Sequence, residues 1–177
     1  MLPLKRLPIM RRTAFTPPPT ALERQLVPVV TTMIASLAVL IPVVATEPLL
    51  PPFGLMVFLG WRLLRGDIWP LWMGLPLGLW DDLFSGQPIG TAMCGWTAIM
   101  LLLDNLDRRT PFRDHRQDWV LAGLAIGGYL LFALMIARVT GGGTSPMALV
   151  PQILLSALLF PLVARLCAAL DRWRSPR

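Results

Sequence analysis

Two adjacent carboxylates, Asp81 and Asp82, are the side chains whose type and setting best suit chemistry. They stand in a long apolar region, just before the turn-forming segment 85–90 (SGQPIG). Burying an aspartate in a membrane costs about 2.5–3.5 kcal/mol, and the reasons to retain one include metal binding, proton transfer and structure. No second acidic cluster accompanies the pair, and His115 falls in a separate polar loop. We therefore expect no metal, no cofactor, no catalytic residue and no enzyme activity.

Two structural interpretations of the pair stay open. In the first, both carboxylates lie at the water-facing boundary and cap the turn. In the second, Asp82 accepts hydrogen bonds from the free backbone amides of the turn, or pairs with Arg138, and so fixes how the helices pack. Neighbouring residues of a helix point about 100° apart, so Asp81 can then lean outward to water or lipid headgroups.

The composition predicts that helices in a lipid bilayer hold this pair. Hydrophobic residues make up 55% of the 177-residue chain, charged residues only 15%, and the mean hydropathy is +0.62. Soluble domains carry about 25% charged residues, and disordered chains are poor in apolar residues, so both classes are excluded. The net charge of +6 suits basic loops that orient a membrane protein, and nucleic acid is not an expected partner.

Uncharged segments divide the chain into stretches that approach the ~20 residues of a membrane-spanning helix. We expect an all-α membrane domain over residues 25–166, between a flexible, basic, proline-rich tail (1–24) and a second basic tail (167–177). Its approximate spans are 25–46, 48–64, 68–84, 87–103, 119–137 and 147–164. The second segment reaches spanning length only if Arg62 extends its charged end to the membrane surface.

The distribution of Lys and Arg predicts the orientation of these six spans. With both termini in the cytoplasm, every Lys and Arg except Arg138 lies on the inner side. Leaving out the second span moves more than half of them outside, and short basic loops stay cytoplasmic. We therefore expect a multi-pass membrane protein with both termini in the cytoplasm.

Small residues recur every four positions around the acidic pair, at Gly74, Gly78, Asp82 and Gly86. This spacing places them along one helix face, where small residues let two helices approach closely in lipid. Residues 123 and 127, both glycine, repeat the spacing in the fifth segment. The neighbouring helix can belong to this chain or to a partner protein, and the sequence leaves that choice open.

Segment 78–90 (GLWDDLFSGQPIG) resembles the signature of the rod shape-determining protein MreD family. The matching positions are Gly78, Asp82, Leu83, Gly86 and Gly90. Asp81 departs from the pattern, because that place is usually apolar in the family. The sequence Pro52-Phe53 at the start of the second segment also fits. Candidate structural or partner-binding residues are therefore Asp82, Gly78, Leu83, Gly86, Gly90, Gly74, Pro88, Asp81 and Arg138.

The resemblance implies a non-enzymatic component of the cell-elongation machinery in the bacterial inner membrane. Its expected partners are MreC above all, then the MreB filament and the transpeptidase and glycosyltransferase that synthesise the cell wall. It also implies a fold similar to the substrate-binding subunits of energy-coupling-factor transporters, so a subunit that binds a vitamin or another small molecule is the alternative. Few polar residues are expected on the outer side, which favours the elongation component; they are Glu47, Asp81, Asp82, Gln87, Arg138 and Thr140.

Overall fold

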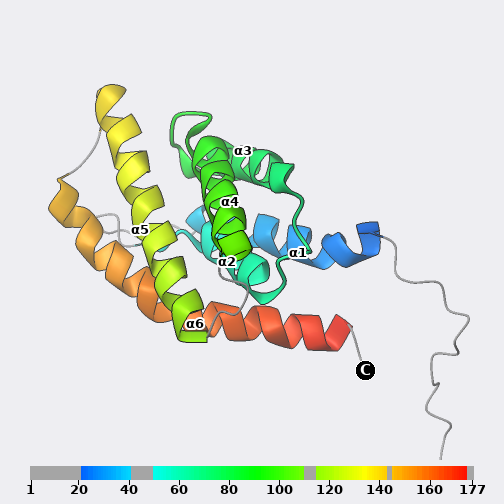
Figure 1. The fold of residues 1–177 in the computed structure, drawn as a ribbon. Coiled ribbons are helices and arrows are strands. Elements are labelled where there is room, and N and C mark those ends of the chain that lie inside the picture. Colours follow the sequence, from blue (N-terminus) through cyan, green and yellow to red (C-terminus); the bar gives the residue numbers. More distant parts are fainter. Residues whose placement is uncertain (1–20, 41–49, 110–114, 143–144, 175–177) are drawn as a thin grey trace, which may run out of the picture.

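The computed structural model describes residues 21–40, 50–109, 115–142 and 145–174, and every regular element within these ranges is helical (Figure 1). In chain order the elements are α1 (Ala21–Ser36), η1 (Leu37–Leu40), α2 (Phe53–Leu64), η2 (Leu71–Met73), α3 (Gly74–Ser85), α4 (Thr91–Arg109), α5 (His115–Val139), η3 (Pro146–Ala148) and α6 (Leu149–Arg174). Each of the six expected apolar segments overlaps one α-helix. The all-helical class predicted from the composition is therefore confirmed for this part of the chain.

The helices pack around α2. Helices α1, α5 and α6 all contact it, while α3 packs along α4 and also against α1. In Figure 1, α5 lies on the left of the bundle and α1 and α3 on the right, while α6 runs from the left across the bottom of the view. The chain reverses direction between α3 and α4, so the segment that contains Asp81, Asp82 and the turn is held between two packed helices.

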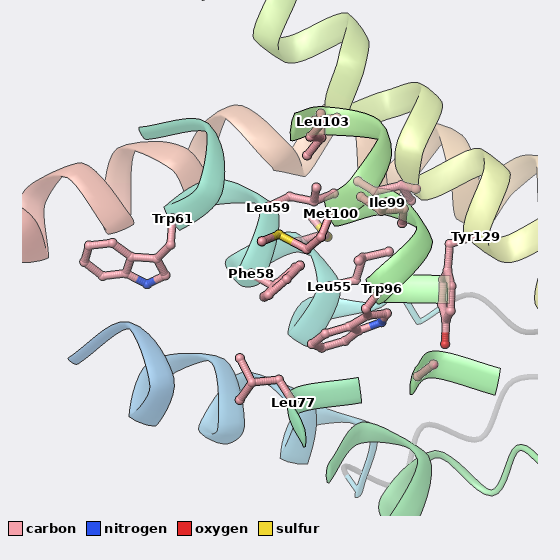
Figure 2. Close-up of a cluster of buried hydrophobic side chains, with 14 of the residues drawn as sticks. Leu55, Phe58, Leu59, Trp61, Leu77, Trp96, Ile99, Met100, Leu103 and Tyr129 are labelled. Carbon is pink, nitrogen blue, oxygen red and sulfur yellow. The ribbon is translucent and has the colours of Figure 1, made fainter. Parts of the chain in front are cut away.

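Helix α2 has 12 residues and lies in the core of the bundle. Its residues Leu55, Phe58 and Leu59 are fully buried and pack with apolar side chains of α4 (Figure 2). The ring of Phe58 lies 5.0 Å from that of Trp96 and 5.5 Å from that of Trp69, measured between centroids. A helix that is apolar on all sides is typical of a buried core position, and such a helix need not match the bilayer thickness.

We expected Arg62, in the last turn of α2, to extend its charged end to the surface, but it does not. Its side chain is only 4% exposed, and its Nη2 lies 2.8 Å from Oδ2 of Asp107 on α4. Because α2 is enclosed by other helices, the guanidinium is neutralised inside the protein rather than in water. A second ion pair nearby joins Arg65 to Asp171 of α6 at 2.7 Å.

Two helical segments are long and apolar enough to cross a membrane, by length and composition: Arg116–Val139 and Pro146–Trp173. Within their most apolar windows only 33% and 22% of residues are buried inside the protein. Their outward faces carry large apolar side chains such as Leu124, Met135 and Leu158. Two further apolar helices, Gln25–Leu40 and Phe53–Leu64, are shorter.

The ends of the helical domain differ from the expected boundaries. Helix α6 continues to Arg174, because Cys167 and Asp171 on its inner side remain buried against the bundle. Helix α1 begins at Ala21, inside the segment expected to be a tail. Residues 1–20, residues 41–46 of the first expected span and residues 175–177 lie outside the described part of the chain.

Candidate functional site

Asp82 caps the N-terminus of α4 from the neighbouring helix. Its side chain is buried, with 3% of the residue exposed. Oδ1 accepts a hydrogen bond from the backbone N–H of Ala92 at 2.7 Å, and Oδ2 accepts from Gly90 at 2.9 Å and Met93 at 3.2 Å. The first amides of a helix lack partners within the helix and carry partial positive charge. Of the interpretations left open by the sequence, the structure shows hydrogen bonding to the turn.

Close contact between the backbones of α3 and α4 brings Asp82 within reach of those amides. A Cβ atom added to Gly78 would lie 2.6 Å from Cα of Met93, and one added to Gly74 would lie 2.9 Å from Cα of Thr97. Real Cβ atoms essentially never come that close. The predicted approach is therefore confirmed at Gly74 and Gly78, and the neighbouring helix belongs to the same chain.

Gly86 and Gly90 serve the turn rather than the helix contact. Gly86 follows α3 with φ of 67°, and Gly90 has φ of 101°. Residues other than glycine rarely adopt these left-handed backbone conformations. Between them, the carbonyl of Pro88 accepts hydrogen bonds from the backbone N–H of Thr91 at 3.1 Å and from its hydroxyl at 2.7 Å. The expectation that Gly86 contributes to close packing is wrong, since no atom lies within 4 Å of its Cβ position.

Helix α5 does not repeat the close approach. Nothing lies within 4 Å of a Cβ added to Gly123, and at Gly127 the nearest atom is Cγ2 of Ile153 at 3.8 Å. Gly123 therefore faces open space, and Gly127 makes an ordinary van der Waals contact. The shared spacing of glycines therefore has different structural consequences in α3 and α5.

Two further predicted residues lie on the outside of the bundle. Leu83 follows Asp82 directly but points away from α4, and it is 60% exposed. Leu79, one turn earlier, is also exposed on α3. Arg138 is exposed in the last turn of α5. The hydrogen bonds to Asp82 come from backbone amides. Its carboxylate therefore does not need the ion pair with Arg138 that the sequence left open.

Asp81 does not lean outward as expected but lines a cavity of about 90 Å³ inside the bundle. A Cβ atom on Gly54 would lie 2.8 Å from Oδ1 of Asp81 and would also contact Oγ of Ser36. These two oxygens are therefore close neighbours. The other polar side chains that line the cavity are Ser85, Gln87, Tyr129 and Gln152.

Part of this polar lining is satisfied internally. The hydroxyl of Tyr129 donates to Oε1 of Gln87 at 3.3 Å, and Nε2 of Gln152 donates to the carbonyl of Leu50 at 2.6 Å. The hydroxyl of Ser36 interacts with the neighbouring carboxylate of Asp81, whereas the buried Oγ of Ser85 has no hydrogen-bond partner within the described residues. Sequence reasoning missed Ser36, because an isolated serine in an apolar segment is a weak signal.

A larger cavity of about 490 Å³ lies between α2, α5 and α6, away from the turn. Its lining is mostly apolar and includes Gly60, Leu63 and Pro161. Arg116 and Arg165 also line it, as does Trp119, whose Nε1 donates to the carbonyl of Ala157 at 2.8 Å. The lining of this cavity is therefore amphipathic, with apolar walls and two arginines.

Across the described ranges, no group of three or more His, Cys, Asp or Glu side chains is placed to hold a metal ion. Glu47, which we considered as an acidic neighbour of the Asp pair, lies outside those ranges. Comparison with protein-family models, with curated proteins and with solved structures gives no match to this chain.

Proposed function

We propose that this chain is a non-enzymatic, multi-pass component of the bacterial inner membrane that acts in the cell-elongation machinery. In this role it couples MreC and the MreB filament to the transpeptidase and glycosyltransferase of wall synthesis, and so regulates rod shape. The observation that carries the proposal is the arrangement of segment 78–90. Four of its five residues that resemble the MreD signature, Gly78, Asp82, Gly86 and Gly90, join α3, the turn and α4 into one interlocked unit.

The geometry of this unit favours a structural role. Gly78 permits the contact between α3 and α4, and Asp82 holds that contact with three backbone amides. A carboxylate occupied in this way is not available as a general base or a metal ligand. Leu83 points outward from the same helix and offers a rigidly placed apolar side chain to lipid or to a partner helix.

The exposed apolar surface supports the membrane location. Large apolar side chains face outward along both α5 and α6, and soluble proteins rarely expose contiguous apolar patches beyond a few hundred Å². In a bilayer these faces contact lipid tails instead of water. The bias of Lys and Arg toward one set of loops supports cytoplasmic termini.

The cavities favour this proposal over a vitamin-binding transporter subunit. Pockets that bind molecules of the size of a vitamin have volumes of about 300–1,000 Å³, whereas the cavity beside Asp81 measures about 90 Å³. The cavity of about 490 Å³ is large enough, but Arg116 and Arg165 line it. The charge bias assigns both arginines to the cytoplasmic side, where a subunit for uptake does not first meet its substrate.

Depletion of the protein in its native rod-shaped cell tests the proposal. We expect the cells to become round while vitamin uptake stays normal, and we expect MreC to co-purify with the tagged protein. Normal shape with impaired vitamin uptake would instead establish the transporter subunit.

A matched pair of variants locates the partner contact. Leu83→Ala should reduce co-purification of MreC several-fold at equal protein levels, because the side chain is exposed beside the interlocked unit. Leu158→Ala is the control, since Leu158 is 71% exposed but lies on α6, outside that unit. Equal recovery of MreC with both variants would remove Leu83 from the interface.

A further inference from the structure

The carboxylate of Asp81 has no cationic partner among the described side chains. The ion pairs there use other acids, namely Asp104, Asp107 and Asp171. Burying an ionised carboxylate away from water carries a large desolvation cost unless a positive group or hydrogen-bond donors compensate it. Asp82, its neighbour, receives three backbone donors. The hydroxyl of Ser36 is a hydrogen-bond partner of Asp81, so the carboxylate of Asp81 receives less compensation than that of Asp82.

The cavity beside Asp81 presents a further unsatisfied oxygen atom. Oγ of Ser85, which lines the cavity, is buried and has no hydrogen-bond partner within the described residues. Ser36 is 3% exposed, and its Oγ lies beside the carboxylate of Asp81. Buried polar groups are nearly always hydrogen-bonded. A weakly compensated carboxylate and two buried hydroxyls around one small space suit an occupant that offers hydrogen-bond donors.

The walls restrict the chemistry of this occupant. Asp81 supplies negative charge and acceptor oxygens, the serine hydroxyls can accept, and apolar groups of Phe53 and Leu130 complete the lining. An ammonium group offers positive charge and three donors in a compact volume. A quaternary ammonium has the charge but no N–H. The cavity, at about 90 Å³, has room for a small group only.

We infer that this cavity binds a primary ammonium group, with the carboxylate of Asp81 as its counter-ion and Ser36 as a hydrogen-bond acceptor. The inference is independent of the proposed function. The ammonium can come from a free small amine or from the headgroup of an aminophospholipid such as phosphatidylethanolamine. Both sources present the same chemistry to the cavity, and the lipid composition around the purified protein distinguishes them.

Thermal unfolding of the full-length protein in phosphatidylcholine nanodiscs provides the test. Methylammonium chloride should raise the unfolding midpoint saturably, by about 3 °C once it is well above its dissociation constant. Tetramethylammonium chloride at the same concentration is the control for charge and ionic strength, and it should leave the midpoint unchanged. Equal shifts with both salts, or no shift with either, would refute the inference.

Variants connect the shift to the cavity. Asp81→Asn and Ser36→Ala should each abolish the response to methylammonium, and the mild Ser36 change keeps the test informative if the Asp81 variant folds poorly. Asp104→Asn is the matched control, because Asp104 pairs with exposed Arg108 on α4 and not with the cavity. A full methylammonium shift in both cavity variants would show that the cation binds elsewhere.

Nanodiscs that contain phosphatidylethanolamine identify the source. If the lipid headgroup fills the cavity, this lipid alone should raise the midpoint of the wild-type protein, and methylammonium should add little. If a free amine is the ligand, the two lipids should give the same midpoint, and methylammonium should act equally in both. A lipid effect that persists unchanged in Ser36→Ala and Asp81→Asn would contradict binding of the headgroup at this cavity.

Discussion

Oδ1 of Asp82 and the backbone nitrogen of Ala92 lie 2.7 Å apart and join the end of α3 to the start of α4. The two residues are ten positions apart in the sequence, so this one carboxylate closes the reversal of the chain. Oδ2 of the same carboxylate accepts hydrogen bonds from the backbone N–H groups of Gly90 and Met93. The negative charge of Asp82 therefore faces the positive end of the α4 dipole.

Asp82→Ala should therefore lower the free energy of unfolding by about 2 kcal/mol, as expected for loss of a charged helix cap. Asp82→Asn should cost less, because one acceptor oxygen remains. Asp81→Ala should also cost less, since no backbone amide of α4 depends on it. Thermal unfolding of purified protein, followed by circular dichroism, ranks the three variants. An equal effect of Asp81→Ala and Asp82→Ala would disprove the specific capping role of Asp82.

Gly78→Ala should destabilise the protein by about 2 kcal/mol, because its new methyl group meets the α4 backbone and cannot be accommodated by a side-chain rotation. Gly123→Ala is the matched control in α5, where the same methyl group meets nothing within 4 Å. Removing a glycine from a helix interior there should stabilise by about 0.5–1 kcal/mol. Opposite signs in the unfolding midpoint are expected, and loss of stability at both positions would contradict the packing described.

The ion pair of Arg62 with Asp107 should show a much larger coupling energy than an exposed pair. A double-mutant cycle with Arg62→Met and Asp107→Asn should give about 2 kcal/mol, because the guanidinium is enclosed by protein. The same cycle on Asp104 and Arg108, which are spaced i,i+4 on α4, should give about 0.3–0.5 kcal/mol. Equal coupling energies would mean that water reaches both pairs.

Single cysteines at the two ends of α4 report the orientation of the chain. In a Cys94→Ser, Cys167→Ser background, Ile89→Cys should react with a membrane-impermeant thiol reagent added to intact cells, because Ile89 is 76% exposed in the turn. Arg108→Cys should react only after the membrane is permeabilised. Labelling of the Arg108 variant in intact cells would reverse or abolish the proposed topology.

Local sequence was sufficient to predict the unit formed by α3 and α4. Gly78, Asp82 and the turn at 85–90 lie within a short stretch, so helix periodicity alone determines which of them share a face. The same reasoning failed for Gly86, because a glycine at the end of a helix is used for its left-handed conformation rather than its size.

Contacts between distant segments were beyond sequence reasoning. Ser36, Asp81 and Gln152 meet only because α1, α3 and α6 pack into one bundle, and no local pattern encodes that meeting. Arg62 was misplaced for a related reason. A charge in a short apolar segment suggests a nearby membrane surface, whereas its partner Asp107 is supplied by a helix much later in the chain.

The dependence of Arg62 on Asp107 also imposes an order on biogenesis. Ribosomes release α2 before α4, so the core helix emerges with an arginine whose counter-charge has not yet been synthesised. Enclosing a guanidinium inside protein without its counter-charge carries a desolvation cost of several kcal/mol. Helix α2 can therefore settle into its final position only after translation has passed Asp107, and truncated chains that end before that residue should be degraded faster than chains that include it.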